Sequence, residues 1–187
     1  MTIAQKNFFY CSLPTFESRT VYEGVKKMVE AYPPSDEEVI RRRWLGTYYA
    51  MCKEPQIELR YISPSIGSGI FAKEYIAAEK LVGEYTGLIK KRTWLTSRRR
   101  DYVGEYTIPG NPVRYIIDAE KYGSLMRFIN HSEEANVYAI TVISKGILRI
   151  YIITKIGICP GDQLLMDYGP DYWRWRFKPD ALNENFT

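Results

Sequence analysis

The sequence has few residues that could cross-link the chain. Among its 187 residues there are only three cysteines, Cys11, Cys52 and Cys159, and a single histidine, His131. The cysteines lie far apart and none belongs to a Cys-x-x-Cys pair, which excludes a disulfide framework and leaves no evident zinc site. We therefore expect a chain that folds without disulfides or a bound metal, in a reducing compartment.

Long apolar runs are also missing. No segment approaches the roughly 20 apolar residues that a membrane-spanning helix requires, and the first residues show no signal-peptide pattern. These absences predict a soluble, intracellular protein that makes no contact with a membrane.

The chain lacks a strong excess of one charge. Its net charge is +4 and its pI is about 8.8. A nucleic-acid-binding domain is usually more basic, with its Lys and Arg residues clustered on one face. Two arginine triplets, at 41–43 and 98–100, are expected to be solvated faces, with docking to an acidic partner as the alternative. Nucleic acid is accordingly expected to be at most an indirect partner.

Apolar residues are plentiful, at 45% of the sequence, and tyrosine is unusually frequent at sixteen. This composition is typical of a folded chain, and the length suffices for one domain with an appended segment. Tyrosine rings suit both a core and an amphipathic channel.

Residues 1–56 are predicted to form a helical N-terminal extension. Val21, Val25 and Val29 repeat every fourth residue between 16 and 32, as on one face of a helix that ends at two prolines.

A second helix is expected after those prolines. Ser35 and Glu38 form a capping-box pattern, and Ile40, Trp44 and Tyr48 then repeat at the same spacing of four. The two helices either pack on the following domain or form a homodimer, and neither carries an evident catalytic group.

After residue 55 the pattern changes to short β-type runs separated by Gly, Pro, Ser and Asn, which predicts a mainly β (β-rich α+β) fold of small twisted sheets. A hairpin turn is expected at 144–146. The expected strands are 57–62, 70–72, 80–85, 106–108, 115–117, 137–143, 147–154 and 163–168.

Three short segments are candidates for a site. Glycine in Gly67-Ser68-Gly69 lets a ligand approach the main chain closely, although a simple turn is the alternative. Asn130-His131-Ser132 ends an apolar segment with three hydrogen-bonding side chains, although a lone histidine is often structural. Tyr168 closes the last run, where a merely buried tyrosine is the plain alternative.

Together these segments resemble the motifs of the SET-domain family of protein lysine methyltransferases. The family reads Arg-Phe-x-Asn-His-Ser with a second Asn four residues on, and it ends in Asp-Tyr. Two further segments, 83–87 and 161–169, follow the family's order and spacing, so the resemblance covers about two-thirds of the chain. The residues of the central motif that stand in register are Arg127, Phe128, Asn130, His131, Ser132 and Asn136.

The resemblance implies a SET-domain fold over residues 57–169, with a C-terminal pseudoknot that ordinary folds avoid. Residues 170–187 would then form an aromatic lid. The implied reaction is methyl transfer from S-adenosylmethionine to the ε-amine of a protein lysine, in a histone or another basic protein.

The resemblance also implies roles for particular residues. The implied catalytic residues are Tyr168 and Tyr85. The implied donor-binding residues are Gly67, Ser68, Gly69, Ile70, Asn130, His131, Tyr168 and Trp173. The implied lining of the substrate channel is Tyr85, Tyr138, Tyr168 and Tyr172.

Such a reaction suits the residue types present. The ordinary pKa of a lysine amine is about 10.4, so at neutral pH the amine is mostly charged and unreactive. A narrow aromatic channel lowers that pKa by desolvation. The transfer then depends on holding the reactants in line, and it needs no metal.

The chain departs from the family in several places. Glu133 stands where Cys is common, Ala135 where Pro is common, and Gln163 where an acidic residue is usual. Residues 170–187 contain no cysteine, so the zinc-binding tail of many family members is not expected here. Its aromatic residues either form the lid or simply pack on the domain: Tyr172, Trp173, Trp175, Phe177 and Phe186.

Several questions stay open at this point. Tyr172 is at the place where an aromatic residue limits the number of methyl groups in some relatives, which predicts mono- or dimethylation. A catalytically silent SET domain that binds a protein, and a basic nucleic-acid-binding domain, are the alternatives to an enzyme. The protein is expected to be intracellular. One option is a nuclear or chromatin-associated location, which would include that of an effector secreted into a host cell.

Overall fold

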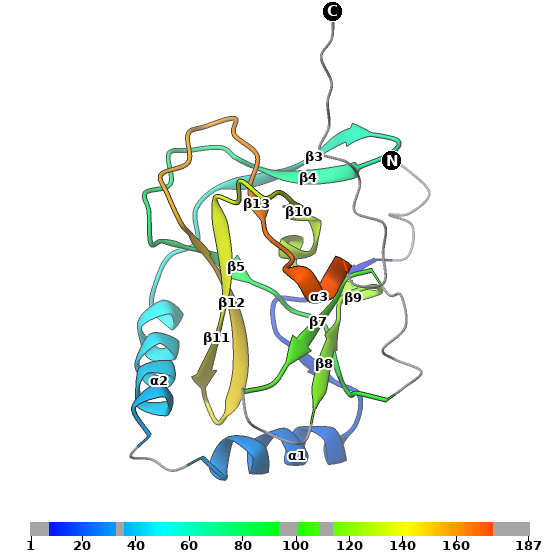
Figure 1. The fold of residues 1–187 in the computed structure, drawn as a ribbon, viewed down its shortest axis with the longest axis vertical. Helices are drawn as coiled ribbons and strands as arrows, with labels where there is room; N and C mark the ends of the chain where they lie inside the picture. Colours follow the sequence, from blue (N-terminus) through cyan, green and yellow to red (C-terminus); the bar gives the residue numbers. More distant parts are fainter. Residues whose placement is uncertain (1–7, 33–35, 94–100, 109–113, 174–187) are drawn as a thin grey trace, which may run out of the picture.

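The computed structural model describes residues 8–32, 36–93, 101–108 and 114–173. The described chain is rich in short strands, and two helices, α1 (Arg19–Glu30) and α2 (Glu37–Ala50), pack against the sheets at their outer side (Figure 1). The prediction of a mainly β chain with a helical N-terminal extension is confirmed.

The strands form two larger sheets and two strand pairs. The five-stranded sheet has the order β10 (Asn130–His131), β13 (Leu165–Met166), β11 (Val137–Ser144), β12 (Ile147–Thr154) and β5 (Leu81–Glu84). The four-stranded sheet has the order β2 (Thr15–Phe16), β6 (Leu88–Lys91), β8 (Tyr115–Asp118) and β7 (Val103–Tyr106). The pairs are β3 (Ile57–Ser63) with β4 (Gly67–Ala72), and β1 (Phe9–Tyr10) with β9 (Tyr122–Gly123).

The C-terminal strand β13 lies between β10 and β11, which are neighbours in the sequence, and it runs parallel to both. The Asn136 side chain holds this arrangement, because its Nδ2 donates to the carbonyl of Gln163 at 2.8 Å and its Oδ1 accepts from the N–H of Leu165 at 2.8 Å. The N–H of Ser132 also donates to the carbonyl of Met166. The late segment thus passes under the 132–136 loop, as the expected pseudoknot requires.

Helix α1 buries its valines as predicted. Val21, Val25 and Val29 all lie in a core cluster that includes strands of both larger sheets. The helix begins at Arg19 rather than at 16, because residues Thr15–Phe16 pair with β6 and the Ser18 hydroxyl caps the helix by accepting from the N–H of Val21.

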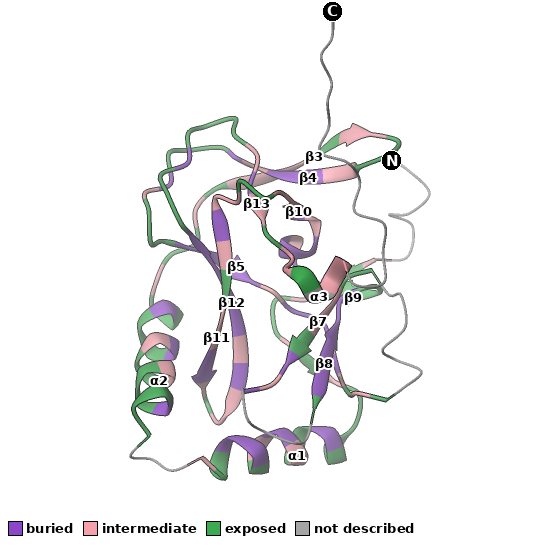
Figure 2. Cartoon of the chain, viewed as in Figure 1, coloured by how far each residue is buried: buried purple, intermediate pink, exposed green. Residues whose placement is uncertain are grey.

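Helix α2 presents a different face from the one predicted. Ile40, Trp44 and Tyr48 are exposed, whereas Val39, Gly46 and Tyr49 are the buried residues. Figure 2 shows that exposed and buried positions alternate along α2. Gly46 explains this orientation, since a Cβ there would come within 2.2 Å of the Ile143 carbonyl oxygen. The close approach of the backbone to β11 turns the apolar repeat toward solvent. Helix α2 therefore packs on the domain, which is one of the two expected alternatives, but through a different face from the apolar repeat.

Two details at the start of α2 also differ from the sequence expectations. Asp36 is the N-cap, with Oδ1 accepting from the N–H groups of Glu38 and Val39, while Ser35 lies outside the described residues. The arginine triplet at 41–43 is not uniformly solvated, because Arg42 pairs with Glu38 at 2.8 Å and donates to the Thr141 carbonyl of β11. The second triplet, at 98–100, lies outside the described residues.

The hairpin between β11 and β12 turns at Lys145 and Gly146, as predicted. Their φ angles are +53° and +76°, the left-handed pair that a two-residue hairpin turn requires. The hairpin runs in unbroken antiparallel register from Val137–Thr154 to Ser144–Ile147, and it supplies the rigid platform on which α2 and β5 rest.

One buried ion pair ties β5 to β12. The Arg149 guanidinium donates through two nitrogens to the two carboxylate oxygens of Glu84, and both side chains are largely buried. Burial raises the pKa of Glu84, although the hydrogen bonds and charge of Arg149 lower it. The next residue after Glu84 is Tyr85, so this pair anchors the end of the strand that leads into the candidate site.

Candidate active site

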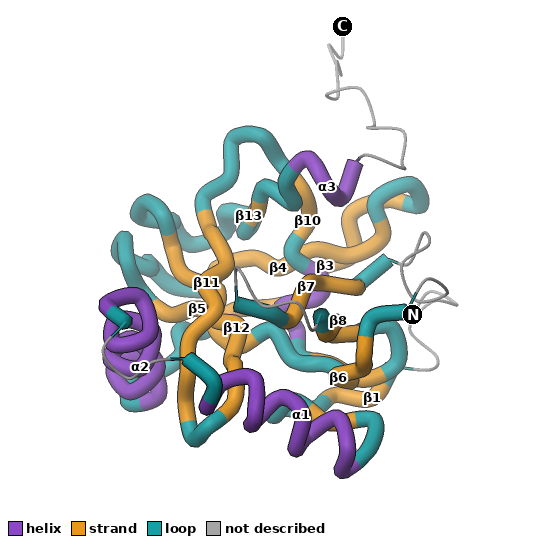
Figure 3. Tube along the Cα trace, turned by 60° about the horizontal axis from the view of Figure 1, so that its bottom comes forward, coloured by secondary structure: helices purple, strands orange, loops and turns teal. Residues whose placement is uncertain are grey.

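The three polar segments found in the sequence lie together in the fold. Asn130 donates through Nδ2 to the carbonyl of Ser68 at 3.2 Å, which joins β10 to β4. The N–H of Tyr168 donates to Nδ1 of His131 at 3.2 Å, which joins the end of β13 to β10. The short helix α3 (Pro170–Trp173) lies beside β10 and β13 (Figures 1 and 3).

His131 has a defined tautomer in this arrangement. Because Nδ1 accepts a hydrogen bond from the main chain, the proton of the neutral ring is on Nε2. That Nε2 is buried and has no hydrogen-bond partner among the described residues. The ring lies edge-on to Trp173, with ring centroids 4.8 Å apart.

Trp173 supplies a second unsatisfied donor. Its indole Nε1, which can only donate, is also buried and without a partner in the described part of the chain. Buried polar groups normally have partners, so two such N–H groups on neighbouring rings mark a place where a ligand with acceptor atoms fits.

The glycines of β4 keep the main chain close to this place. Gly67 has a φ of +81°, a conformation that favours glycine. A Cβ at Gly69 would lie 2.5 Å from Nε2 of Gln163 and 3.0 Å from Nδ2 of Asn130. A side chain at Gly69 would therefore displace the ends of the Gln163 and Asn130 side chains, and Asn130 is the residue that joins β10 to β4.

Ile70 is placed differently from what the resemblance implies. Its side chain is fully buried in the core cluster with Ile129 and Leu164, and its carbonyl accepts from the N–H of Leu164. The Ile70 side chain thus belongs to the core, and a role in donor binding would fall to its main chain.

Tyr168 is held at both ends. Its hydroxyl donates to the carbonyl of Ile129 at 2.6 Å, and its N–H is the group bound to His131. The ring packs edge-on against Tyr172, with centroids 4.6 Å apart. Burial, followed by the neighbouring Tyr172 phenol, raises the pKa of Tyr168 well above its ordinary value.

Tyr85 follows β5 and lies near Tyr168. Its hydroxyl donates to the carbonyl of Tyr102 at 2.9 Å. Burial, and then the proximity of Tyr168, raises the pKa of the Tyr85 phenol. Both phenols therefore stay neutral, and each has committed its single proton to a main-chain carbonyl.

This pairing fixes what the two phenols can do chemically. A phenol that donates its proton elsewhere presents only oxygen lone pairs to its surroundings. Tyr85 and Tyr168 can accept an N–H from a nearby amine, but they cannot cap the nitrogen lone pair. An amine held here would keep that lone pair free for reaction.

Tyr138, expected in the same channel, is elsewhere. Its hydroxyl donates to Oε2 of Glu79 at 2.8 Å, and its ring packs in a cluster with Tyr49 and Tyr151 on the side of α2. Side chains alternate across a strand, so Tyr138 faces away from its neighbour Val137, which pairs with Met166 of β13. The assignment of Tyr138 to the channel is wrong.

Two residues of the site carry no role in the sequence expectations. Tyr102 supplies the carbonyl that binds Tyr85, yet it lies in a stretch without a motif. Arg127 belongs to the central motif, and the structure places its guanidinium 3.8 Å from the centroid of the Tyr102 ring. The frequency of tyrosine was the only signal that could have pointed to Tyr102.

The residues present fit S-adenosylmethionine as a ligand. The orphaned N–H groups of His131 and Trp173 would meet its acceptor atoms, and the open space beside Gly67 allows close approach of its polar end. The neighbouring aromatic rings suit a positively charged sulfur.

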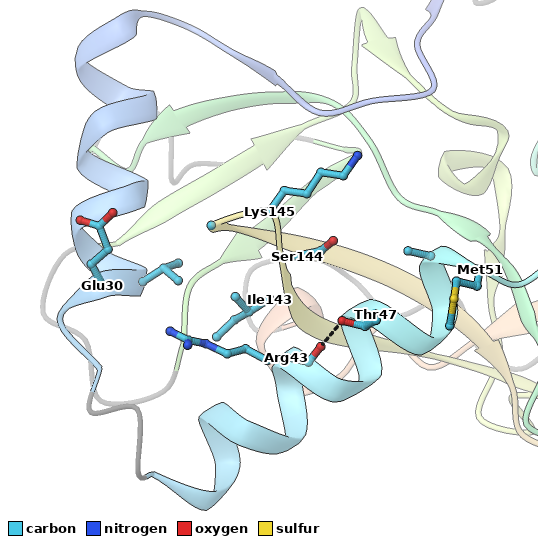
Figure 4. A pocket seen from close by; sticks show the side chains of 10 residues that line it. Glu30, Arg43, Thr47, Met51, Ile143, Ser144 and Lys145 are labelled. Atoms are coloured by element: carbon cyan, nitrogen blue, oxygen red, sulfur yellow. Dashed lines mark hydrogen bonds between the residues drawn. The ribbon is translucent and has the colours of Figure 1, made fainter.

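Other possible sites are less developed. Among the described residues no group of three His, Cys, Asp or Glu could hold a metal ion, and no helix is long and apolar enough to span a membrane. A hollow of about 600 Å³ lies between the end of α1, α2 and the β11–β12 turn. Figure 4 shows Arg43, Glu30 and Lys145 around it, with Thr47 donating to the Arg43 carbonyl at 3.1 Å. It brings together no pair of groups suited to catalysis.

Comparison with known proteins agrees with this geometry. A family model described as SET domain matches residues 67–169. Histone-lysine N-methyltransferase CLF of Arabidopsis thaliana is 31% identical over 147 residues, which cover 73% of this chain and 16% of the relative. Histone-lysine N-methyltransferase trithorax of Drosophila virilis is 31% identical over 186 residues, which cover 88% of this chain and 5% of the relative. The chain thus spans only a small part of the length of these curated relatives.

Solved structures share the fold. ATXR5 in complex with histone H3.1 has a TM-score of 0.63 at 17% identity, over 87% of this chain and 81% of that one. KRYPTONITE in complex with DNA, an H3(1–15) peptide and SAH has a TM-score of 0.53 at 30% identity, over 63% of this chain and 24% of that one. These similarities confirm the expected fold class.

Proposed function

Because this chain belongs to the SET-domain family, we propose that it transfers a methyl group from S-adenosylmethionine to the ε-amine of a protein lysine. The observation that carries the proposal is the convergence at Tyr168, whose N–H binds His131 and whose hydroxyl binds the Ile129 carbonyl. These two hydrogen bonds would hold a donor site beside His131 and the amine-orienting hydroxyl of Tyr168 at a fixed distance from each other.

Four residues would hold the donor. The open space beside Gly67 allows close approach to the main chain, Gly69 follows on the same strand, and Nε2 of His131 and Nε1 of Trp173 supply two N–H groups without a partner among the described residues. Bound S-adenosylmethionine supplies a methyl group on a positively charged sulfur. An uncharged lysine nitrogen can attack the methyl carbon, with the sulfur as the leaving group.

Tyr85 and Tyr168 would orient the acceptor. Their oxygens accept N–H groups of the amine, while their own protons stay on the carbonyls of Tyr102 and Ile129. Because the phenols are neutral, they add no negative charge that would favour the ammonium form of the lysine. The lysine must release a proton to solvent before it reacts, and the new C–N bond forms as the C–S bond breaks.

A histone or a similar basic protein is the substrate that the observations favour. The cited relatives are named as histone-lysine methyltransferases, and both cited structures contain histone H3. Glu133, Glu134 and Asp167 are exposed acidic residues on the segments that flank His131 and Tyr168, where they would attract a lysine-rich peptide. A nuclear or chromatin-associated location follows from such a substrate, and nucleic acid would then be met only through it.

The proposed division of the chain keeps the SET domain at 57–169, since β3 pairs with β4 and so belongs to it. Residues 170–187 would form an aromatic lid, of which Tyr172 and Trp173 are described and already pack on Tyr168 and His131. Trp175, Phe177 and Phe186 lie outside the described residues.

Homodimerisation through α2 is a further part of the proposal. Ile40, Trp44, Tyr48 and Met51 form an exposed apolar stripe along the helix. Two copies paired antiparallel would bury the stripe and bring Lys53 of each near Glu38 of the other. Light scattering on Trp44→Glu is expected to give half the mass of the wild type, and a monomeric wild type would remove the dimer.

The enzymatic proposal is tested with labelled donor and a panel of histones and other basic DNA-packaging proteins. Mass spectrometry is expected to find methyl-lysine with the wild type. Tyr168→Phe should lower turnover by about a hundredfold or more, with donor affinity by calorimetry unchanged. Donor binding without transfer to any substrate would instead indicate a silent binding module, and absence of donor binding would contradict the proposal altogether.

A nucleic-acid-binding domain is the remaining alternative. It predicts an affinity for DNA or RNA that falls steeply with salt concentration. A gel-shift series from 50 to 300 mM salt separates this alternative from the enzyme, for which no such affinity is expected.

A further inference from the structure

Arg127 has unusual surroundings for a charged residue. Only 7% of it is exposed, and its guanidinium carbon lies 3.8, 4.5 and 4.8 Å from the ring centroids of Tyr102, Phe8 and Phe128. Its Nη2 donates to the main-chain carbonyl of Glu120 at 3.1 Å, while its Nε is buried without a partner in the described residues. A cation enclosed by three rings holds those rings in place through cation–π attraction.

Tyr102 is held in a conformation that its side chain does not favour. Its φ is +64°, in the left-handed region, which is strained for a bulky residue and persists only where the surrounding structure enforces it. About a third of the residue is exposed, so the core does not enforce this conformation. The Arg127 guanidinium packs on the ring, and the N–H of Ala119 binds the carbonyl of the same residue.

The Tyr102 carbonyl is the link to the site. It accepts both the hydroxyl of Tyr85 at 2.9 Å and the N–H of Ala119 at 2.9 Å. The direction in which the Tyr85 hydroxyl points therefore depends on the peptide unit of Tyr102. If that carbonyl moved, Tyr85 would be free to turn its proton toward a bound amine.

We propose that Arg127 is a positioning residue, which acts by stacking on Tyr102 and thereby keeps the Tyr85 hydroxyl turned away from the lysine nitrogen. This inference rests on the proposed function for its catalytic consequence. Without Arg127, the Tyr85 proton would compete for the amine lone pair that has to attack the methyl carbon, and the orientation of the amine would be lost.

The kinetic test compares four variants. Arg127→Met removes the stack and is expected to lower kcat by about tenfold or more, while the KM for the donor stays within about twofold, since Arg127 touches no donor-binding residue. Arg127→Lys should recover part of the rate. Tyr102→Gly removes the ring and should lower kcat like Arg127→Met, whereas Tyr102→Phe keeps the ring and should lower kcat much less than Tyr102→Gly does.

The double variant tells positioning from general destabilisation. If Arg127 acts through the Tyr102 ring, Arg127→Met should cause no further loss of kcat in the Tyr102→Gly background. Multiplicative losses, or an unchanged kcat in a folded Arg127→Met protein, would overturn the proposal. Should Arg127→Met fail to fold, the comparison of Tyr102→Gly with Tyr102→Phe still decides, because Tyr102 is at the surface.

A measurement without turnover separates this proposal from the proposed function. Tyrosine labelled with ¹³C at Cζ reports the hydrogen bond of each phenol, and the Tyr85 signal can be assigned with Tyr85→Phe. The signal is expected to shift in Arg127→Met and Tyr102→Gly but not in Tyr102→Phe. An unshifted signal would contradict the positioning role whether or not the protein transfers methyl groups.

Discussion

The hydroxyl of Tyr168 donates to the carbonyl of Ile129, 39 residues earlier in the chain, at a distance of 2.6 Å. This bond keeps the phenol proton on a main-chain carbonyl and away from a bound amine, and burial raises the pKa of the same phenol. The arrangement has consequences for the pH dependence of both activity and stability.

Activity should rise with pH. The substrate lysine must lose a proton, and its ordinary pKa is about 10.4, so log(kcat/KM) is expected to climb with a slope of up to one between pH 7 and 9. Since the pKa of Tyr168 and of Tyr85 is raised, neither phenol should ionise and reverse the rise below pH 10. A pH–rate profile that falls between pH 8 and 9.5 in a folded protein would contradict this.

Stability should change in the opposite direction at high pH. Burial raises the pKa of several phenols, and for Tyr138 burial and the hydrogen bond to Glu79 raise it to about 12. In the unfolded chain these phenols ionise near pH 10, whereas in the folded chain they keep their protons. The free energy of unfolding should therefore be constant up to about pH 9 and fall above pH 10, as urea titrations at each pH would measure.

Tyr172 gives a prediction about the product. Its ring packs 4.6 Å from the Tyr168 ring, so Tyr172→Phe, which removes one oxygen beside the phenol, should leave room for a more highly methylated amine. Mass spectrometry is expected to show mainly mono- and dimethyl-lysine for the wild type and more trimethyl-lysine for the variant. Tyr138→Phe is the matched control and should leave the product ratio unchanged, because Tyr138 faces Glu79.

Trp173 can be tested for the use of its free N–H. Trp173→Phe keeps an aromatic ring against His131 but removes the buried Nε1 donor, and donor affinity should fall by roughly five- to tenfold, about the value of one hydrogen bond. Trp44→Phe makes the same change on the exposed face of α2 and should leave donor affinity unchanged. Equal calorimetric affinities for the two variants would exclude Nε1 from the donor site.

The Glu84–Arg149 pair predicts a large effect on stability. Arg149→Met leaves the Glu84 carboxylate buried without its cation, which should lower the free energy of unfolding by about 3–5 kcal/mol. The loss should be smaller at pH 5 than at pH 8, because a buried carboxyl that takes up a proton avoids the charge. Adding Glu84→Gln to Arg149→Met should restore much of the stability, and urea titrations with no such recovery would argue against the pair.

The sequence predicted the fold well where the pattern was periodic or the motif was long. The strands at 137–143 and 147–154 were found to within a residue, because each is a long apolar run beside a glycine turn. Several strands of two to four residues were not predicted, among them Thr15–Phe16, Leu88–Lys91 and Asn130–His131. Their pairing depends on partners far away in the chain, which local periodicity does not contain.

The site was predicted in the same uneven way. Asn130, His131 and Tyr168 were expected from their motifs, and the structure brings them together. Tyr138 was wrongly assigned to the substrate channel, because its place in the sequence two residues after Asn136 does not show on which face of the strand its side chain lies. Tyr102 was missed because its contribution is a carbonyl group, which every residue has, held by a contact with Arg127 that only the tertiary structure reveals.

Strand β13 consists of two residues, and it is the segment that delivers Tyr168 to the site. So short a strand opens at a lower free energy than the long hairpin of β11 and β12 beside it, since few contacts must break. Warming would release the end of the chain from the loop that covers it before the hairpin and its helices come apart. Methyl transfer would then stop at a temperature at which most of the protein is still folded.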